Sequence, residues 1–403
     1  MLNQDFITAV LALPEFDAVD GAIQQNGSLI IEVSLLYDLA LCPACKQPCS
    51  FVLAYKDRLT RDLSISGRAT FLSYKQRRFR CENCKATFYE RLQSIDSVGA
   101  HYTIRYEEWI CQQVRQSSIK AVAIQEGLSW DGVQYILNRV AKRRRLFDKP
   151  QVVRWVAIDE IALKKGHKQY ALVISAPEQG RILAVLEGRK KQDLTGWLKE
   201  NWTIQQRMKV EVVTIDMWDA YFYAVLESLP SATIVIDRFH VEKNLNEAIS
   251  KLRRKIQKEL PREMNKEMKG ARWLIVRNYD ELDEDSKHRL DEILGKCPQL
   301  AVCHWVKEEF RDWYEEEYEV EVAGKKLEEW KEVANSLGST AMSNFIKTLD
   351  NWGEWILNYF DERASNGFAE GINNALKLLK RKAYGFRNFD NFRLRVLLLH
   401  TIS

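Results

Sequence analysis

The sequence predicts a multidomain α/β protein, and three observations in its 403 residues support this class. Two Cys-x-x-Cys pairs near the N-terminus are followed by a pair of short helical patterns. Beyond Pro150, apolar runs alternate with amphipathic helical patterns, as in a sheet covered by helices. A later stretch of about 120 residues is too long for a plain loop and has helical patterns throughout.

The composition is that of a folded protein that does not cross a membrane. Hydrophobic residues make up 46% of the chain, with 12 Trp, and no run of about 18 apolar residues is present. The N-terminus has an apolar patch but lacks the basic region of a signal peptide. We therefore expect an intracellular, reducing location.

Charge is segregated along the chain, although the net charge is only +4. Residues 1–40 carry six acidic and no basic side chains, whereas residues 41–150 carry 20 basic and 10 acidic ones. Residues 280–335 hold 18 acidic against eight basic residues, and the last 39 residues hold seven basic against two acidic. Two basic blocks separated by an acidic one favour two surfaces that face a polyanion, although any single block also fits a solvated surface.

Four cysteines form the knuckles Cys42-x-x-Cys45 and Cys81-x-x-Cys84. Two knuckles can present four thiolates tetrahedrally to one zinc ion, and the intervening residues have a strand pattern. Disulfides are an alternative that a reducing location disfavours, and a redox motif needs only one pair. We expect one structural Zn²⁺ in a zinc ribbon; Cys49 could replace a ligand, although its spacing fits less well.

Basic side chains and a helix pair follow in the same region. The second strand of the ribbon offers a phosphate-contacting edge formed by Lys75, Arg77, Arg78 and Arg80. Helices expected at 119–125 and 130–140, with a turn at Gly127, have the spacing of a DNA-reading helix-turn-helix. A generic helical hairpin is the alternative. The adjoining ribbon and a basic tail favour DNA contacts, which we assign to Gln134, Asn138, Arg143 and Arg144.

The order beyond Pro150 is three strands, helix, strand, helix, strand, which is typical of an RNase H-like sheet. Apolar runs end in Asp159 and Asp216, and a further run leads to Asp237 and His240. Carboxylates at strand ends can converge at one edge of the sheet, and Mg²⁺ prefers carboxylates and water. Two such ions about 3.5–4 Å apart promote phosphoryl transfer. A single Asp at a strand end is more often a cap or turn residue, but two in a DNA-binding chain favour a metal site.

Glu370 is a lone acid at the head of a basic helix, in the stretch "SNGFAEGINNALKLLKRKAYGFRNFDNFR". It shares a helical face with Asn374, Lys377 and Arg381, and the opposite face is apolar. This pattern favours an acid that faces the two aspartates, with bases that hold phosphates nearby. The alternative is that Glu370 only complements the positive helix N-terminus.

The chain resembles bacterial insertion-sequence transposases of the ISL-three family, which are RNase H-like DDE transposases, over nearly its whole length. The blocks that carry the resemblance are "CPAC…RRFRCENCKATF", "VAIDEIALKKGHKQY", "TIDMWDAY", "VIDRFHVEKNLNEA" and "SNGFAEGINNALKLLKRKAYGFRNFDNFRLRV". The last two blocks are the most specific.

The resemblance implies the site residues. Asp159, Asp216 and Glu370 take the roles of the catalytic acid triad and hold two Mg²⁺ or Mn²⁺ ions, with Asp159 as the candidate to bridge both. Asp237 and His240 match an Asp-x-x-His signature and are possible accessory residues. Asp219 competes with Asp216, which is preferred because it ends the apolar strand. The bases expected to position the DNA strand are Lys377, Lys380, Arg381 and Arg387.

The expected domains follow from these motifs. An acidic segment spans 1–40, the zinc ribbon 41–92, and the helix-turn-helix region 93–148. The RNase H-like catalytic domain spans 149–403 and is interrupted by an all-helical insertion at 243–363, as the family implies. Most tryptophans of the insertion are expected in its core, although one or two could stack on an unpaired base.

The predicted function is that of a DNA transposase that binds terminal inverted repeats and catalyses metal-dependent cleavage and strand transfer. Its expected partners are the element's ends, target DNA and a second copy of the chain, because such reactions join two ends. We expect it in the bacterial cytoplasm, associated with the nucleoid. The alternatives are a DNA-binding repressor or domesticated transposase that no longer cuts, and a structure-specific nuclease of the RNase H superfamily.

Overall fold

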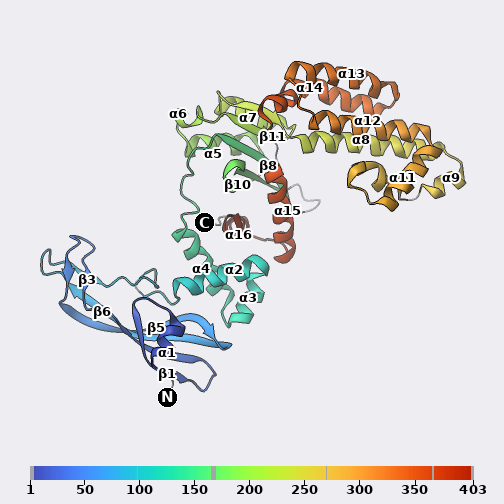
Figure 1. Ribbon diagram of the computed structural model, residues 1–403. Helices are drawn as coiled ribbons and strands as arrows, with labels where there is room; N and C mark the ends of the chain where they lie inside the picture. Colours follow the sequence, from blue (N-terminus) through green and yellow to red (C-terminus); the bar gives the residue numbers. More distant parts are fainter. Residues whose placement is uncertain (1–3, 98, 165–168, 269, 365–366, 401–403) are drawn as a thin grey trace. The chain divides into compact units, whose positions relative to one another are not determined.

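The structure is a computed structural model that describes residues 4–97, 99–164, 169–268, 270–364 and 367–400 (Figure 1). The backbone divides into two compact units. The first comprises residues up to 147 together with 379–386 and 390–399, and the second comprises residues 148–378 with 387–389. None of the helices in these described ranges is both long and apolar enough to cross a membrane.

A twisted sheet forms the base of the first unit. Its strands are β1 (Phe16–Ile23), β2 (Leu29–Leu35), β5 (Val52–Ile65), β6 (Arg68–Arg80) and β7 (Thr87–Tyr89), in the order β1-β2-β6-β5 with β7 also on β6. The β5–β6 hairpin turns at Ser66 and Gly67, whose φ angles of 50° and 73° are both positive, as a primed two-residue turn requires. The two strands expected between the cysteine knuckles are therefore confirmed.

Residues 1–40 do not form a segment separate from the ribbon. Helix α1 (Gln4–Leu11) packs on β1, and β2 pairs in parallel with β6. Leu11, Phe16 and Leu72 are buried in one shared core. Asp17, Asp20 and Glu32 are exposed on a sheet whose other face is apolar, so residues 1–40 lie in the same compact unit as the ribbon.

Three helices complete the first unit: α2 (Ile104–Gln116), α3 (Ile119–Glu126) and α4 (Trp130–Arg143). Ser118 and Ser129 cap α3 and α4, and Gly127 ends α3 in the left-handed conformation with φ of 65°. The expected helix pair is confirmed, although α4 continues three residues further than expected.

The last helix of the described chain, α16 (Phe389–His400), contributes to this same unit. Leu394 and Leu398 are buried with residues of α2, α3 and α4. The guanidinium of Arg395 donates to the backbone oxygens of Val114 and Ser117 at the end of α2. The expected catalytic domain, 149–403, therefore differs from the compact second unit at its C-terminal end, because these leucines complete the core of the helix-turn-helix.

The second unit is built on a mixed sheet in the order β10-β9-β8-β11-β12. Its elements are β8 (Trp155–Lys164), β9 (Gln169–Ala176), the short helix η1 (Pro177–Gln179), β10 (Arg181–Glu187), α5 (Lys191–Asn201), α6 (Ile204–Arg207), β11 (Val212–Ile215), α7 (Asp219–Ser228) and β12 (Thr233–Ile236). β8, β9 and β10 pair antiparallel, whereas β8, β11 and β12 run parallel. This is the RNase H-like order predicted from the sequence.

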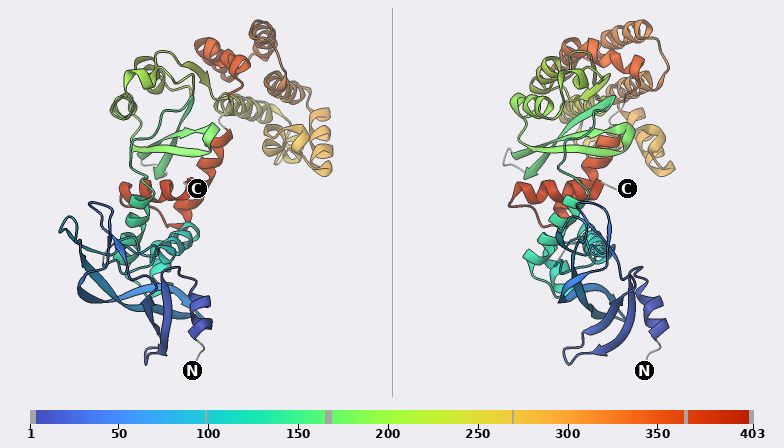
Figure 2. Two further views of the ribbon diagram at one scale, coloured as in Figure 1. Left: turned by 60° about the vertical axis from the view of Figure 1, so that its left-hand side comes forward. Right: turned by 90° about the vertical axis from the view of Figure 1, so that its left-hand side faces the viewer.

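A helical insertion follows β12 directly. Its helices are α8 (Arg238–Glu259), α9 (Arg262–Glu267), α10 (Ala271–Val276), the short η2 (Tyr279–Glu281), α11 (Glu284–Lys296), α12 (Pro298–Glu315), α13 (Val320–Ser336) and α14 (Thr340–Glu362), which are visible in Figures 1 and 2. Phe310, Trp313 and Trp330 stack in its core. The first helix begins at Arg238, five residues before the expected boundary. Helix α14 returns to pack on α8 and β12, and α15 (Gly367–Lys382) follows.

Candidate functional site

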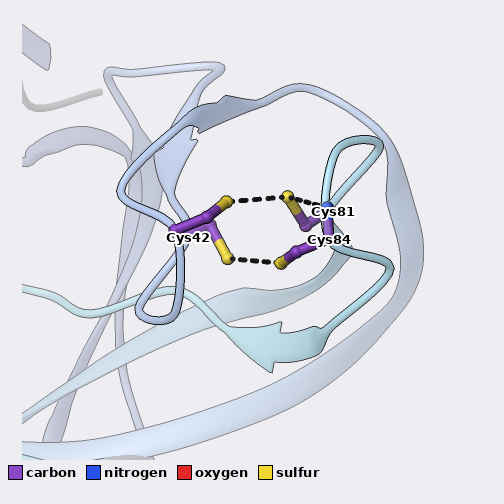
Figure 3. Close-up of side chains that lie close together, drawn as sticks. Cys42, Cys81 and Cys84 are labelled. Carbon is purple, nitrogen blue, oxygen red and sulfur yellow. Dashed lines mark hydrogen bonds between the residues drawn. The ribbon is translucent and has the colours of Figure 1, made fainter.

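The four knuckle cysteines converge at one end of the first unit (Figure 3). Their Sγ atoms all lie within 4.8 Å of one another, with 3.5 Å between Cys42 and Cys84 and between Cys45 and Cys81. Zn–S bonds of about 2.3 Å place the sulfurs of a tetrahedral site about 3.8 Å apart, so the cluster fits one structural zinc ion. Cys49 lies in the small core beside the cluster and is not one of the four grouped thiols.

The backbone of each knuckle is shaped for a metal. Lys46 and Lys85, which each follow the second cysteine, adopt positive φ angles of 62° and 61°. Their amides donate to the carbonyls of Cys42 and Cys81 and close the two turns. The Cys84 amide also points at Cys81 Sγ, and this hydrogen bond is the largest influence that lowers the pKa of Cys81 to about 6. A low pKa favours the thiolate, which is the form that binds zinc.

Helix α4 presents polar side chains away from its buried face. Asn138 is exposed and Gln134 is half-buried, whereas Val133 and Ile136 are fully buried against α2 and α3. Val133 and Ile136 thus lie on the buried face of α4, whereas Asn138 lies on its exposed face. Gln134 and Asn138 remain predicted DNA contacts.

Three of the predicted DNA-contacting arginines have partners inside the protein. Arg77 is buried and its guanidinium pairs with Glu90 at 2.7 Å. Arg143 pairs with Glu107 and Glu108 at 2.5 and 2.7 Å, and Arg144 pairs with Glu108. These ion pairs join β6 to the segment after β7 and α4 to α2. Phosphate contacts by Arg77, Arg143 and Arg144 remain a prediction, and in the structure these three side chains form ion pairs within the protein.

The remaining basic edge of β6 is open to solvent. Arg78 and Arg80 are exposed, as is Lys75. Because side chains alternate across a strand, Arg78 and Arg80 share one face of β6, whereas Lys75 lies on the opposite face with the buried Arg77 and Phe79. Arg78 and Arg80 remain predicted phosphate contacts.

Three aspartates of the second unit lie at one level of the sheet. Thr214 pairs with Ala157 in the parallel register of β11 and β8, so two residues further on Asp216 falls opposite Asp159. Ile215 pairs with Ile236 of β12, so Asp216 also falls beside Asp237. The sequence pattern predicts that Asp159 ends its strand. In the structure it lies inside β8, because β8 continues to Lys164 as the partner of β9.

The pKa of Asp159 is strongly affected by its surroundings. Its side chain is 7% exposed, and burial raises its pKa from 3.8 to about 6, with further contributions from Asp237 and Asp216. The positive charge of His240 opposes this rise. A buried carboxyl group that is surrounded by other acids ionises with difficulty. A bound cation stabilises its ionised form.

His240 connects the other two aspartates. Its Nδ1 lies 3.1 Å from Asp237 and its Nε2 lies 3.8 Å from Asp216. Burial lowers the pKa of His240, but the contact with Asp237 and the charges of Asp216, Asp237 and Asp159 outweigh it, so the pKa is raised. Asp237 also caps α8 by accepting from the Phe239 amide, which fixes His240 one turn into the helix.

Asn373 is a site residue that the sequence pattern missed. Its Nδ2 donates to Asp159 Oδ2, and its Oδ1 is buried without a hydrogen-bond partner among the described residues. The helical face assigned from the sequence passed through Asn374, which is exposed. The adjacent amides Asn373 and Asn374 mark this part of the helix, but the sequence alone does not show which of them meets Asp159.

Glu370 lies in α15, but its side chain falls outside the described part of the structure. The competing acid Asp219 is exposed in the first turn of α7, where a carboxylate complements the helix N-terminus. Further along, Lys377, Arg381 and Arg387 are exposed and Lys380 is half-buried.

Sequence comparisons match three parts of the chain to known domains. Residues 156–396 match a model described as a transposase, and residues 99–141 match the helix-turn-helix domain of transposase family ISL3. Residues 38–84 match the zinc-finger of transposases IS204, IS1001, IS1096 and IS1165. The three matches follow the order of the ribbon, the helix pair and the sheet with its acids.

Two relatives are similar over most of their length. The transposase for insertion sequence element IS1001 of Bordetella parapertussis is 31% identical over 363 residues, which cover 88% of this chain and 87% of the relative. The transposase for insertion sequence element IS1557 of Mycobacterium tuberculosis is 25% identical over 314 residues, 72% of this chain and 70% of the relative.

Proposed function

Because the chain belongs to the ISL3 family of transposases, and so is a DNA-binding enzyme of DNA transposition, we propose that Asp159, Asp216 and Glu370 are its catalytic acids. The observation that carries this proposal is the hydrogen bond from Asn373 to Asp159, whose neighbour in register is Asp216. Glu370 precedes Asn373 by three positions in α15, and residues three apart in a helix are neighbours on one side. The contact therefore supports a site where α15 meets the sheet.

These residues fit a pair of divalent cations. The buried Asp159, the adjacent Asp216 and the unpartnered Asn373 Oδ1 are hard oxygen donors of the kind that Mg²⁺ and Mn²⁺ accept. We propose that Asp159, Asp216 and Glu370 would hold two such ions, with Asp159 as the candidate to contact both. Bound there, the ions would supply activation of the attacking water or 3′-hydroxyl and stabilisation of the leaving oxygen.

The protein's other groups prepare this site. Asn373 orients the carboxylate of Asp159, and His240 holds Asp216 and Asp237 apart while balancing part of their charge. Lys377, Lys380, Arg381 and Arg387 position the phosphates of the strand that is cut. The ribbon and helix-turn-helix select terminal inverted repeats through Arg78, Arg80, Gln134 and Asn138. Two ends must be joined to the target, so the active complex is a dimer, which light scattering of the protein bound to end DNA tests.

The test of the acid assignment is cleavage of a labelled duplex carrying the element's own end, with Mg²⁺ or Mn²⁺. Glu370→Gln keeps the shape of the side chain and removes its charge, so it should bind the end like the wild type and fail to cut. Asp219→Asn removes an exposed carboxylate three residues from Asp216 and should cut normally. A Glu370→Gln protein that cuts at the wild-type rate contradicts the assignment, and a wild type that binds but never cuts favours a repressor.

A further inference from the structure

The helical insertion contains a cationic cavity that the catalytic site does not include. It has a volume of about 460 Å³ and lies between the C-terminal half of α8 and the segment of α9 and α10. Its lining includes Arg253, Arg262, Lys266 and Arg272, and none of the described residues that line it is acidic. Four cations without a lining carboxylate create a strongly positive potential in a concave site.

Arg253 is the buried member of this group. It is 9% exposed, and its guanidinium donates to the amide oxygen of Gln257. Its Nε is buried and has no hydrogen-bond partner among the described residues. Burial lowers the pKa of Arg253, and the charges of Arg254 and Arg272 lower it further. A buried cation with an unused donor is costly unless an anion occupies the cavity.

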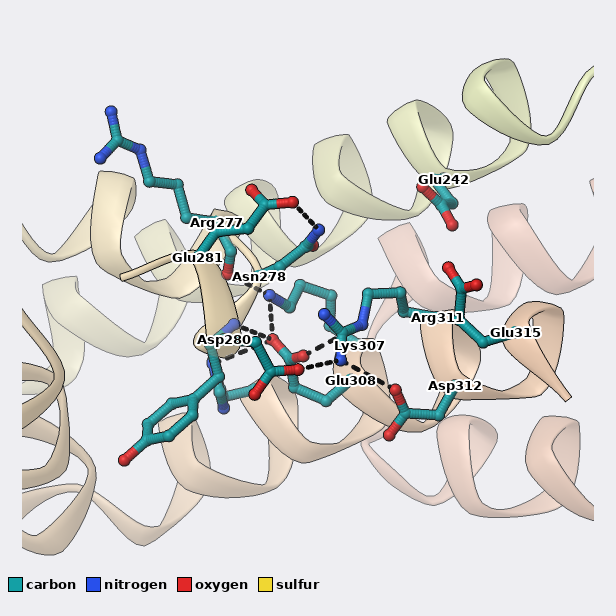
Figure 4. Close-up of polar contacts among 12 residues, drawn as sticks. Glu242, Arg277, Asn278, Asp280, Glu281, Lys307, Glu308, Arg311, Asp312 and Glu315 are labelled. Carbon is teal, nitrogen blue, oxygen red and sulfur yellow. Dashed lines mark hydrogen bonds and ion pairs between the residues drawn. The ribbon is translucent and has the colours of Figure 1, made fainter. Parts of the chain in front are cut away.

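Two other cations of the same insertion, the buried Lys307 and the half-buried Arg311, have acidic partners (Figure 4). Lys307 pairs with Glu308, and Arg311 lies 2.9 Å from both Asp280 and Asp312. The insertion is therefore rich in acids that satisfy its internal bases. Among the described residues that line the cavity, no carboxylate is available to pair with Arg253. In this respect Arg253 differs from Lys307 and Arg311.

An exposed aromatic ring adjoins the cavity. Trp273 is 64% exposed, and the guanidinium of Arg272 lies 5.0 Å from the centre of its ring. The expectation that these tryptophans are core residues holds for Trp313 and Trp330 but not for Trp273. A solvent-facing tryptophan beside arginines is typical of surfaces that bind nucleic acid.

We propose that this cavity binds a backbone phosphate of DNA, with Arg253 as the buried anchor and Arg262, Lys266 and Arg272 around it. The inference rests on the chain's function as a DNA transposase, because DNA is the polyanion that it must hold. Guanidinium groups match phosphate oxygens with paired hydrogen bonds. The insertion thereby becomes a second DNA-holding surface, in addition to the ribbon and helix-turn-helix.

The test is the salt dependence of binding of the full-length protein to end DNA. The double variant Arg262→Gln/Arg272→Gln removes two exposed charges at the cavity, and Lys325→Gln/Lys347→Gln removes two exposed charges elsewhere in the insertion. Each lost phosphate contact should reduce the slope of log affinity against log salt by about 0.9 and weaken binding roughly threefold at low salt. We expect this change for the cavity variant only.

A single variant of the anchor adds a second readout. Arg253→Gln should weaken end binding in the same way and leave the melting temperature equal or higher, because it removes an uncompensated buried charge. Equal salt slopes for the wild type, the cavity double variant and its control would overturn the proposal. If the wild type still binds and cuts the end normally, only the cavity proposal fails and the proposed catalytic function stands. A wild type that never cuts contradicts the proposed catalytic function.

Discussion

At the scale of single residues, Asp159 lies in the kind of environment that the proposed cation site requires. Burial and two neighbouring carboxylates raise its pKa to about 6, and two donors, the Glu160 amide and Asn373, hold its oxygens in place. The cost of crowding acids is therefore offset in part by fixed hydrogen bonds. Preorganised acids lose little entropy when a metal binds.

Asn373→Ala tests this positioning role. A hydrogen bond to a charged group contributes about 1.5–3 kcal/mol, so its loss should slow end cleavage by roughly 10- to 100-fold and raise the Mg²⁺ concentration needed for half-maximal rate. Affinity for the end should not change. Asn374→Ala removes an exposed amide at the adjacent position and should behave like the wild type, and equal metal dependence of the two variants would contradict the role.

The residue scale is also where sequence patterns succeed and fail most clearly. Asp216 and Asp237 are identifiable because each follows a short, fully buried strand. Asn373 is not, because an error of one position on a helix moves a side chain by about 100°. The roles of Arg77 and Arg143 depend on Glu90 and Glu107, which come close only after folding.

At the scale of elements, the zinc ribbon depends on its metal more than on its core. Among the described residues, the fully buried cluster at the knuckles consists of Phe79 and three cysteines, which is too little apolar surface to hold the two knuckles together. Zinc binding supplies folding free energy on the order of 10 kcal/mol in small domains.

Cys81→Ser should therefore lose the bound zinc and weaken end binding, while Cys49→Ala should retain one zinc per chain because Cys49 is outside the grouped thiols. Metal analysis of the two purified proteins, together with end-binding titrations, distinguishes them. One zinc per chain in the Cys81→Ser protein would argue against the four-thiolate site.

Helix α12 carries a buried histidine that should make the insertion sensitive to acid. Burial, reinforced by Lys307 and opposed by Glu308 and Asp291, lowers the pKa of His304 from 6.5 to about 4. Between pH 4 and pH 6.5, His304 binds more protons in the unfolded chain than in the folded protein. The contribution of His304 to stability is therefore fully present above pH 6.5 and is lost as the pH falls toward 4. The free energy of unfolding should drop by about 2 kcal/mol between pH 7 and pH 5.

Denaturant titrations at the two pH values measure this drop. His304→Gln should reduce it, whereas His288→Gln should not, because the side chain of His288 is 78% exposed. A pH dependence identical in all three proteins would place its origin elsewhere. Periodicity indicated helices here, but it could not reveal that His304 is enclosed, since enclosure depends on the packing of α12 against its neighbours.

At the scale of the whole molecule, the core of the DNA-reading helices is discontinuous in sequence. Leu394 and Leu398 of α16 are packed with α2, α3 and α4, more than 240 positions earlier in the chain. Local patterns predicted α3 and α4 but gave no prediction for α2 or α16, and nothing local indicates that α16 belongs with the first unit. The expected domain 149–403 and the compact second unit therefore differ in where they place α16.

Leu398→Ala should destabilise the first unit by about 2–5 kcal/mol, the usual cost of a cavity in a core, and weaken end binding although Leu398 is far in sequence from α4. Leu378 is 49% exposed, so Leu378→Ala should change stability by less than about 0.5 kcal/mol. Calorimetry with end-binding titrations compares them. Equal stability of the two variants would show that α16 is dispensable for the reading helices.

The discontinuous core also bears on the moment at which the protein becomes able to recognise its element. During synthesis the ribbon and α2 to α4 leave the ribosome well before α16, the helix that closes their core, is made. A nascent or prematurely ended chain would present the reading helices with an apolar face open to water. Recognition of the element's ends thus matures together with the catalytic half of the polypeptide, so interrupted translation yields few competitors for the same DNA.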